Sequence, residues 1–131
     1  MKYVYNDGGR SKYFKGEARD CVTRAIAIAT NRDYKEVYNE VAKIIGYTPR
    51  NGVKKKDTKK VMEKLGFKWI PCMGIGTGCT IHLKENELPN GIIICRVTGH
   101  ICCVIDKVIN DTFDPSRDET RCVYGYWIIR R

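Results

Sequence analysis

Apolar residues recur at helical spacing through the first half of the chain. Residues 21–30 are rich in Ala and nearly free of charge, which is typical of a buried helix. After residue 33 the apolar residues fall on one face at intervals of three or four, which predicts a second helix, and a third, shorter helix follows. We expect Asp20 and Asp33 to cap the N-termini of the first and second helices, and Asp57 or Thr58 to begin the third. Gly46 and Gly66 are expected to end the second and third helices.

The second half of the chain changes to alternating and short continuous apolar runs, which favour strands. The expected strands span 67–71, 91–97, 101–105, 108–113 and 122–129, with Asp106-Lys107 as the turn between the third and the fourth. Helices therefore precede antiparallel strands, which predicts an α+β fold in a single domain, 1–131. Residues 1–20 are polar and contain Gly, so we expect an N-terminal arm or loop, or a short edge strand.

The composition, 43% hydrophobic and 30% charged, is that of a globular chain. Lys and Arg number 24 against 15 Asp and Glu, a net charge of +9. Such a surface attracts nucleic acid, acidic proteins or anionic lipid, but no nucleic-acid-binding motif is present, so an acidic protein or peptide is the favoured partner. No apolar run reaches the roughly 20 residues of a membrane helix and the N-terminus has no apolar signal core, so we expect a cytoplasmic protein without membrane contact.

The seven cysteines are an odd number, which, without a signal segment, favours free thiols in a reducing cytosol. Cys95, Cys102, Cys103 and Cys122 lie in strand-like apolar runs, so we expect them to be small core residues. The remaining question is whether any one cysteine differs chemically from the others.

A metal site is the first alternative role for a cysteine. Cys79 and His82 have the C-x-x-H spacing of zinc ligands, and Cys72 lies seven residues before Cys79. A structural zinc site needs four ligands, usually as two close pairs, and the second pair is missing. The Gly-rich segment 73–79 lacks the Lys-Ser/Thr of a phosphate-binding loop. We therefore expect neither a metal nor a cofactor.

Cys21 stands where a nucleophilic thiol would be placed. It begins the Ala-rich helix, where free amide N–H groups and the helix dipole stabilise a thiolate and can also bind an oxyanion. A general base must be one of the two histidines, His82 or His100. His100 is the better candidate because it follows Gly99 at the start of a strand and can face a cleft there.

A third polar group would orient the imidazole. A two-residue turn at 106–107 places His100 opposite Phe113, so Asp111 lies on the same face, one diagonal step away. Asp114 shares that face only with a longer turn or a bulge. Asp111 is therefore preferred as the third member, with Asp114 as the alternative.

The ordered set Asp20-Cys21, Gly99-His100 and an Asp on the return strand resembles the papain-like superfamily of thiol enzymes. The small bacterial type that includes bacteriocin-leader peptidases is the most similar subgroup, and segments 111–116 and 123–127 also resemble uncharacterised bacteriophage proteins. The resemblance covers about residues 13–127. It implies N-terminal helices, with the nucleophile at the start of the central one, packed on a C-terminal antiparallel sheet.

One part of the papain-like pattern is missing. These enzymes usually place a Gln, which donates to the oxyanion, a few residues before the nucleophile, and residues 14–19 contain none. A Glu17 carboxylate would repel an oxyanion. The backbone N–H of Cys21, with the side chain of Arg19 or Lys15, is the expected replacement.

The resemblance implies acyl transfer through a thioester, in which Cys21 attacks a peptide, amide or isopeptide carbonyl, His100 transfers the proton and Asp111 orients His100. The expected function is a phage-type thiol hydrolase or acyl transferase. The alternative is a non-enzymatic basic binding module, such as a phage inhibitor of a host factor, on a degenerate papain-like fold. The oligomeric state is left open by the sequence.

Overall fold

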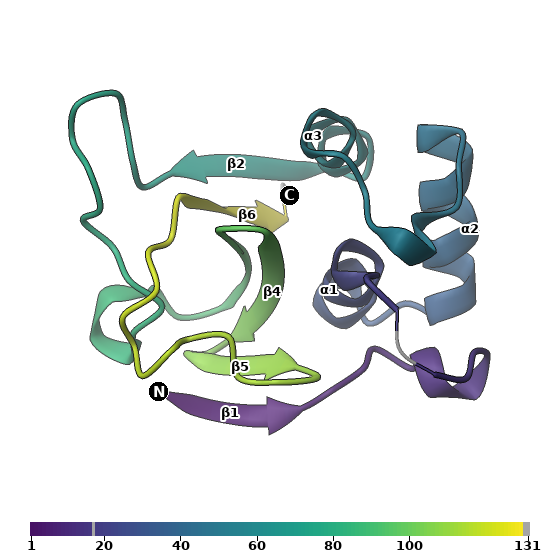
Figure 1. Ribbon diagram of the computed structural model, residues 1–131, viewed down its shortest axis with the longest axis horizontal. Helices are drawn as coiled ribbons and strands as arrows, with labels where there is room; N and C mark the ends of the chain where they lie inside the picture. The colour runs from purple at the N-terminus through teal and green to yellow at the C-terminus, as the bar shows by residue number, and fades with distance from the viewer. Residues whose placement is uncertain (17, 130–131) are drawn as a thin grey trace.

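The computed structural model describes residues 1–16 and 18–129. Three α-helices lie together on one side of a six-stranded sheet (Figure 1). The helices are α1 (Cys21–Thr30), α2 (Tyr34–Ile45) and α3 (Lys55–Lys64), and the strands are β1 (Lys2–Tyr5), β2 (Phe67–Pro71), β3 (Ile92–Val97), β4 (His100–Ile105), β5 (Val108–Asp111) and β6 (Gly125–Ile129). The predicted α+β class is therefore confirmed.

The sheet is mixed, with the strand order β1-β5-β4-β3-β6-β2. Strand β1 runs parallel to β5, whereas the other pairs are antiparallel. The expectation of a purely antiparallel, C-terminal sheet is therefore wrong, whereas the alternative of a short edge strand within residues 1–20 is confirmed by β1. A parallel pair needs a long crossover rather than a hairpin, and here nearly the whole chain separates β1 from β5.

The hairpin between β4 and β5 has the predicted two-residue turn. Asp106 and Lys107 both have positive φ, 47° and 67°, as a type I′ turn requires. Ile105 pairs with Val108, which is the register that the sequence predicts. Strand β5 ends at Asp111 rather than at residue 113.

The start of α3 differs from the prediction. The helix begins at Lys55, with Lys54 at the N-cap, so Asp57 and Thr58 lie in its first turn. Asp57 is used elsewhere, because its carboxylate accepts a hydrogen bond of 2.7 Å from the Tyr47 hydroxyl. The N-cap of α2 is as predicted, since the side chain of Asp33 accepts from the Glu36 amide.

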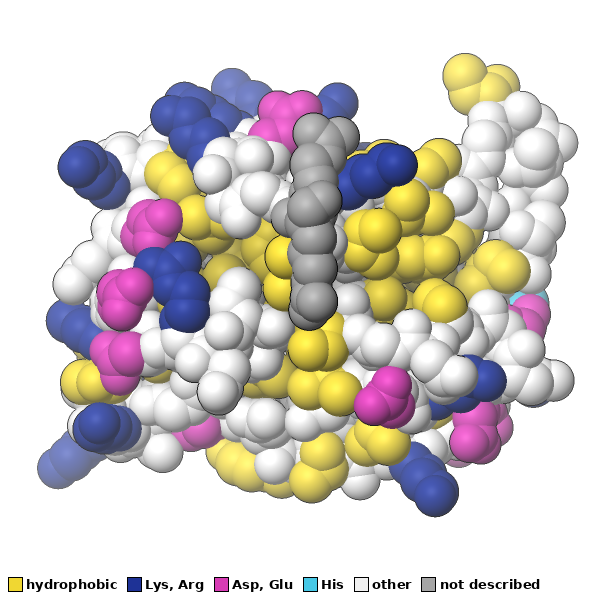
Figure 2. Space-filling model, turned by 180° about the vertical axis from the view of Figure 1, so that it is seen from behind, with side chains coloured by type: hydrophobic (Ala, Val, Ile, Leu, Met, Phe, Trp, Pro, Cys, Tyr) yellow, Lys and Arg dark blue, Asp and Glu magenta, His cyan; other side chains and the backbone are white. Residues whose placement is uncertain are grey.

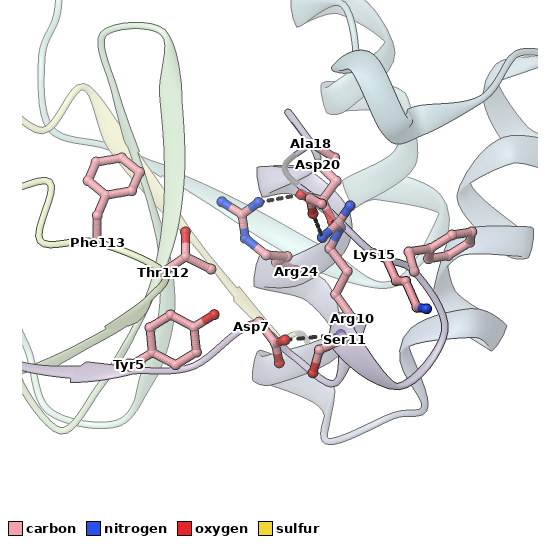
Figure 3. A pocket seen from close by; sticks show the side chains of 12 residues that line it. Tyr5, Asp7, Arg10, Ser11, Lys15, Ala18, Asp20, Arg24, Thr112 and Phe113 are labelled. Atoms are coloured by element: carbon pink, nitrogen blue, oxygen red, sulfur yellow. Dashed lines mark hydrogen bonds and ion pairs between the residues drawn. The ribbon is translucent and has the colours of Figure 1, made fainter.

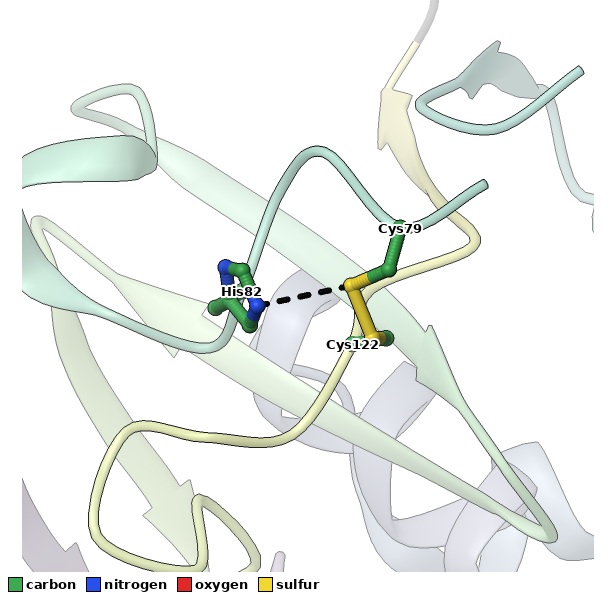
Figure 4. Close-up of side chains that lie close together, drawn as sticks. All are labelled: Cys79, His82 and Cys122. Atoms are coloured by element: carbon green, nitrogen blue, oxygen red, sulfur yellow. Dashed lines mark hydrogen bonds between the residues drawn. A yellow bond between two sulfur atoms is a disulfide. The ribbon is translucent and has the colours of Figure 1, made fainter. Parts of the chain in front are cut away.

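The start of β6 and the oxidation state of two cysteines also differ from the predictions. The strand begins at Gly125, and Cys122 lies before it, in an isolated bridge with His82. Cys122 forms a disulfide with Cys79, with the Cα atoms 5.8 Å apart (Figure 4). The predictions that all seven thiols are free and that Cys122 is a core strand residue are therefore wrong, because the pairing depends on a contact 43 residues distant in the chain.

The core has a layer on each face of the sheet. The helices cover one face, where α1 packs on β4 and β3. Irregular segments cover the other face, and their buried apolar residues include Leu83, Leu88 and Val123. Within residues 1–16 and 18–129, no helix is both long enough and apolar enough to cross a membrane. On the face seen in Figure 2, Lys and Arg side chains are most numerous on the helical side of the molecule.

Candidate active site

Cys21 is the first residue of α1 and is half-buried. Asp20 holds the N-cap position, but its side chain makes no capping hydrogen bond, contrary to the prediction. The carboxylate of Asp20 instead contacts the side chains of Arg10, Arg24 and Tyr34. The amide N–H groups of the first turn of α1 are consequently left free of a side-chain cap beside the Cys21 thiol.

His100 opens β4, and the hairpin brings Asp111 to it. The Nε2 atom of His100 lies 2.6 Å from Oδ2 of Asp111, and the His100 side chain is 11% exposed. The ring of Phe113 packs against the imidazole, with the centroids 4.9 Å apart. Asp114, the alternative third member, instead accepts a hydrogen bond of 2.9 Å from the Ser116 amide in the following turn.

The electrostatics of Cys21 and His100 are coupled. Burial raises the pKa of the Cys21 thiol, but hydrogen bonding to His100, the His100 charge, the Ile101 amide and Arg24 outweigh burial, so the net pKa is lowered. Burial lowers the pKa of His100, whereas hydrogen bonds to Asp111 and Cys21 and their negative charges raise it, to about 9. Both shifts favour a thiolate beside an imidazolium.

The other free cysteines contrast with Cys21. Burial raises the pKa of Cys72, Cys95, Cys102 and Cys103, the last to about 12. None of these four thiols gains a partner that overcomes the cost of burying its charge. Among the described free thiols, the pKa is lowered at Cys21 alone.

Arg24 connects α1 to the hairpin of β4 and β5. It lies one turn after Cys21 and is 6% exposed. Its guanidinium pairs with Asp20, and its Nη2 atom lies 3.4 Å from Oδ1 of Asp111, the carboxylate that holds His100. Figure 3 shows Arg24 and Arg10 converging on Asp20 in a cavity of about 750 Å³. The chain of contacts thus runs from Asp20 through Arg24 and Asp111 to His100.

Cys21 and His100 open into a second cavity of about 470 Å³, which we call the Cys21 cavity. Arg19, a predicted oxyanion donor, lines it, and so do Asn51 and Arg96. Lys15 lines the neighbouring cavity of Figure 3 instead, so it lies away from the thiol. The predicted repulsion by Glu17 falls outside the described residues.

Sequence reasoning missed Arg24, Asn51 and Arg96. Arg24 carried a signal, because it is the one charged residue in an otherwise uncharged helix and lies three positions after Cys21, on the same face. Asn51 and Arg96 reach the cavity from a loop and from β3, and their proximity depends on tertiary packing alone.

The second histidine belongs to a separate cluster. The Nε2 atom of His82 lies 3.5 Å from Sγ of Cys79, which is bonded to Cys122 (Figure 4). The Nδ1 atom of His82 faces the Glu87 carboxylate at 3.2 Å. Cys72, the third zinc ligand considered, is not part of this cluster. His82 therefore does not approach Cys21 as a base.

No model of a known protein family matches this chain, and comparisons with curated proteins and with solved structures give no match.

Proposed function

We propose that this protein is a papain-like thiol hydrolase or acyl transferase that acts on a peptide, amide or isopeptide bond. The observation that supports this most directly is the pairing of Cys21, whose pKa is lowered, with His100, which Asp111 holds at 2.6 Å. A thiolate at a helix N-terminus, an adjacent imidazolium and an orienting carboxylate are the parts that nucleophilic catalysis by cysteine requires.

The proposed reaction has two steps. The Cys21 thiolate attacks the carbonyl carbon, and the collapse of the tetrahedral intermediate breaks the C–N bond while the His100 imidazolium gives its proton to the leaving amine. A thioester to Cys21 remains. Neutral His100 then takes a proton from a water molecule, or from an acceptor amine, which attacks the thioester carbonyl. The C–S bond breaks, the carboxylic acid or the new amide leaves, and the thiolate–imidazolium pair is restored.

Donors for the oxyanion are available without a Gln. The uncapped amides of the first turn of α1 lie beside the thiol, and Arg19 and Asn51 line the same cavity. Preorganised donors of this kind contribute roughly 3–4 kcal/mol to stabilising such a transition state. Because Asp20 turns its carboxylate toward Arg10 and Arg24, it does not compete for these amides.

The proposal is tested by alkylating the protein with iodoacetamide between pH 5 and pH 10 and reading each cysteine by peptide mass spectrometry. We expect Cys21 to react fastest below pH 7 and to lose this advantage in His100→Ala. Asp111→Asn should weaken it as well, since a neutral amide no longer stabilises the imidazolium.

Asp114→Asn is the matched control for Asp111→Asn, because it makes the same chemical change in the adjacent turn. It should leave the pH profile of Cys21 unchanged. Equal, slow reaction of Cys21 and the core thiols, or an unchanged profile in His100→Ala, would show that the thiolate–imidazolium pair does not exist.

A further inference from the structure

The Cys21 cavity leads along the sheet to a second, apolar hollow. Arg96 lines both the Cys21 cavity and an adjoining cavity of about 510 Å³. We call this second cavity the aromatic recess, and its other lining residues are Lys55, Lys56, Lys59, Trp69 and Trp127. A further cavity of about 340 Å³, which we call the outer hollow, shares Lys59 and both tryptophans with the recess.

The floor of the aromatic recess is a pair of indole rings. The ring centroids of Trp69 and Trp127 lie 4.5 Å apart. Trp127 is 4% exposed and belongs to the core, whereas Trp69 is 36% exposed and presents its surface to solvent. Gly125 leaves room for the Trp69 ring, because a Cβ at residue 125 would lie 2.3 Å from Cζ2 of Trp69. The recess is therefore a fixed apolar surface.

The rim of the aromatic recess is uniformly basic. The exposed Lys55, Lys56 and Lys59 project from α3, and Arg96 lies at the boundary with the Cys21 cavity. None of the described residues that line the recess is acidic, and Glu63 lies only in the outer hollow. Four cations around an apolar surface attract a ligand that combines a large apolar group with negative charge.

We infer that the aromatic recess binds an acidic segment of a peptide substrate, with a bulky apolar side chain on the tryptophans and flanking carboxylates on the lysines and Arg96. This inference rests on the proposed function, because the recess can bind part of a substrate only if Cys21, in the adjoining cavity, is the nucleophile. Arg96, Trp127 and Trp69 lie on the neighbouring strands β3, β6 and β2. Strands are about 4.8 Å apart, so the recess extends about 10 Å beyond Arg96, or three residues of an extended peptide.

The same chemistry favours a peptide over single-stranded nucleic acid. Successive bases need several free aromatic faces on which to stack. Here the two rings pack on each other and Trp127 is buried, which leaves one exposed indole. One apolar side chain between carboxylates fits that surface.

The test measures binding to Cys21→Ala, which separates recognition from chemistry. The probe is a fluorescein-labelled peptide, Gly-Glu-Phe-Glu-Ala-Gly-Gly, followed by fluorescence polarisation. Two comparison peptides replace either both Glu residues by Lys or the Phe by Ala. We expect the probe to bind about tenfold more tightly than either of them. Trp69→Ala should abolish the preference for Phe, and Lys59→Glu should reduce the preference for Glu at least about threefold.

Lys60→Glu is the matched control for Lys59→Glu. Lys60 is exposed on the same helix but does not line the recess, so this variant changes the net charge equally and should retain the preference. Equal affinity for the three peptides, no binding of any of them, equal effects of the two charge reversals, or displacement by a poly-dT oligonucleotide would each overturn the inference. The alkylation of Cys21 uses no peptide, so failure of this test is distinct from failure of the proposed function.

Discussion

Arg24 is the residue that joins the two halves of the candidate site. It lies on the helix that carries Cys21, and it contacts the carboxylate that holds His100. Two buried carboxylates, Asp20 and Asp111, share this one guanidinium. Buried charges persist only when they are paired, so the position of Asp111 and the helix start depend on the same side chain. We regard Arg24 as a positioning residue.

Replacing Arg24 therefore has a predictable cost. Arg24→Gln leaves Asp20 with Arg10 and Asp111 with His100, and we expect the free energy of unfolding to fall by about 3 kcal/mol, measured by urea denaturation. Arg32→Gln is the matched control, because Arg32 pairs with Glu36 and Glu40 at the surface, with its side chain 32% exposed. That variant should lose at most about 1 kcal/mol. Equal losses in the two variants would contradict the stabilisation of two buried carboxylates by Arg24.

At the scale of elements, what could be predicted was what is encoded locally. Strand β2 spans 67–71 as predicted, and the hairpin turn at 106–107 sets the register that brings Asp111 to His100. These features follow from apolar periodicity and turn geometry, which a short window of sequence contains. The helix prediction for 21–30 succeeded for the same reason.

The two failures that changed the topology and the cross-linking involve contacts between distant segments. Strand β1 pairs with β5 across most of the chain, and Cys122 joins Cys79 instead of continuing β6. No local pattern distinguishes β1 or Cys122 from an ordinary strand or core residue, because their partners are chosen by tertiary packing. The Asp20 failure is different, because its carboxylate pairs with Arg24, four residues later, and with Arg10.

The disulfide fastens the irregular segment 72–91 to the chain before β6. Cross-linking residues 43 apart in the sequence restricts the unfolded chain, so we expect Cys79→Ser/Cys122→Ser to lose about 3 kcal/mol of stability and to melt about 10 °C lower. Dithiothreitol should lower the melting temperature of the wild type to a similar value and leave the double variant unchanged. Cys72→Ser, a free thiol in the same segment, is the control. Insensitivity of the wild type to reduction would contradict the cross-link.

At the scale of the whole molecule, the candidate site exists only when the helical layer and the sheet are packed together. α1 supplies the thiol, whereas β4 and β5 supply the imidazole and the carboxylate. Unfolding therefore returns Cys21 and His100 to their ordinary pKa values, 9.0 and 6.5. The stability of the whole chain is consequently linked to the protonation of this pair.

The linkage predicts a pH dependence that one substitution exposes. Between pH 6.5 and 9 the unfolded chain carries one proton of the pair, on the Cys21 thiol. In the folded chain, above the lowered pKa of Cys21, that proton lies on His100, whose pKa is raised to about 9. Above the lowered pKa of Cys21, both states therefore bind one proton, and the pair contributes no slope in the wild type. Cys21→Ser removes the thiol proton from the unfolded state, and Asp111 still raises the pKa of His100 in the folded state. Stability should then fall as the pH rises above 6.5, by up to about 1.4 kcal/mol per pH unit.

Urea denaturation of the two proteins from pH 6 to pH 9 measures this difference. The fall ends near the folded pKa of His100 in the variant, which lies below 9 because the thiolate no longer contributes to it. Adding His100→Gln to Cys21→Ser should restore the flat profile, since neither group then titrates. If Cys21→Ser keeps the pH dependence of the wild type, Asp111 alone does not hold the proton on His100 against burial, and the raised pKa of His100 depends on the Cys21 thiolate.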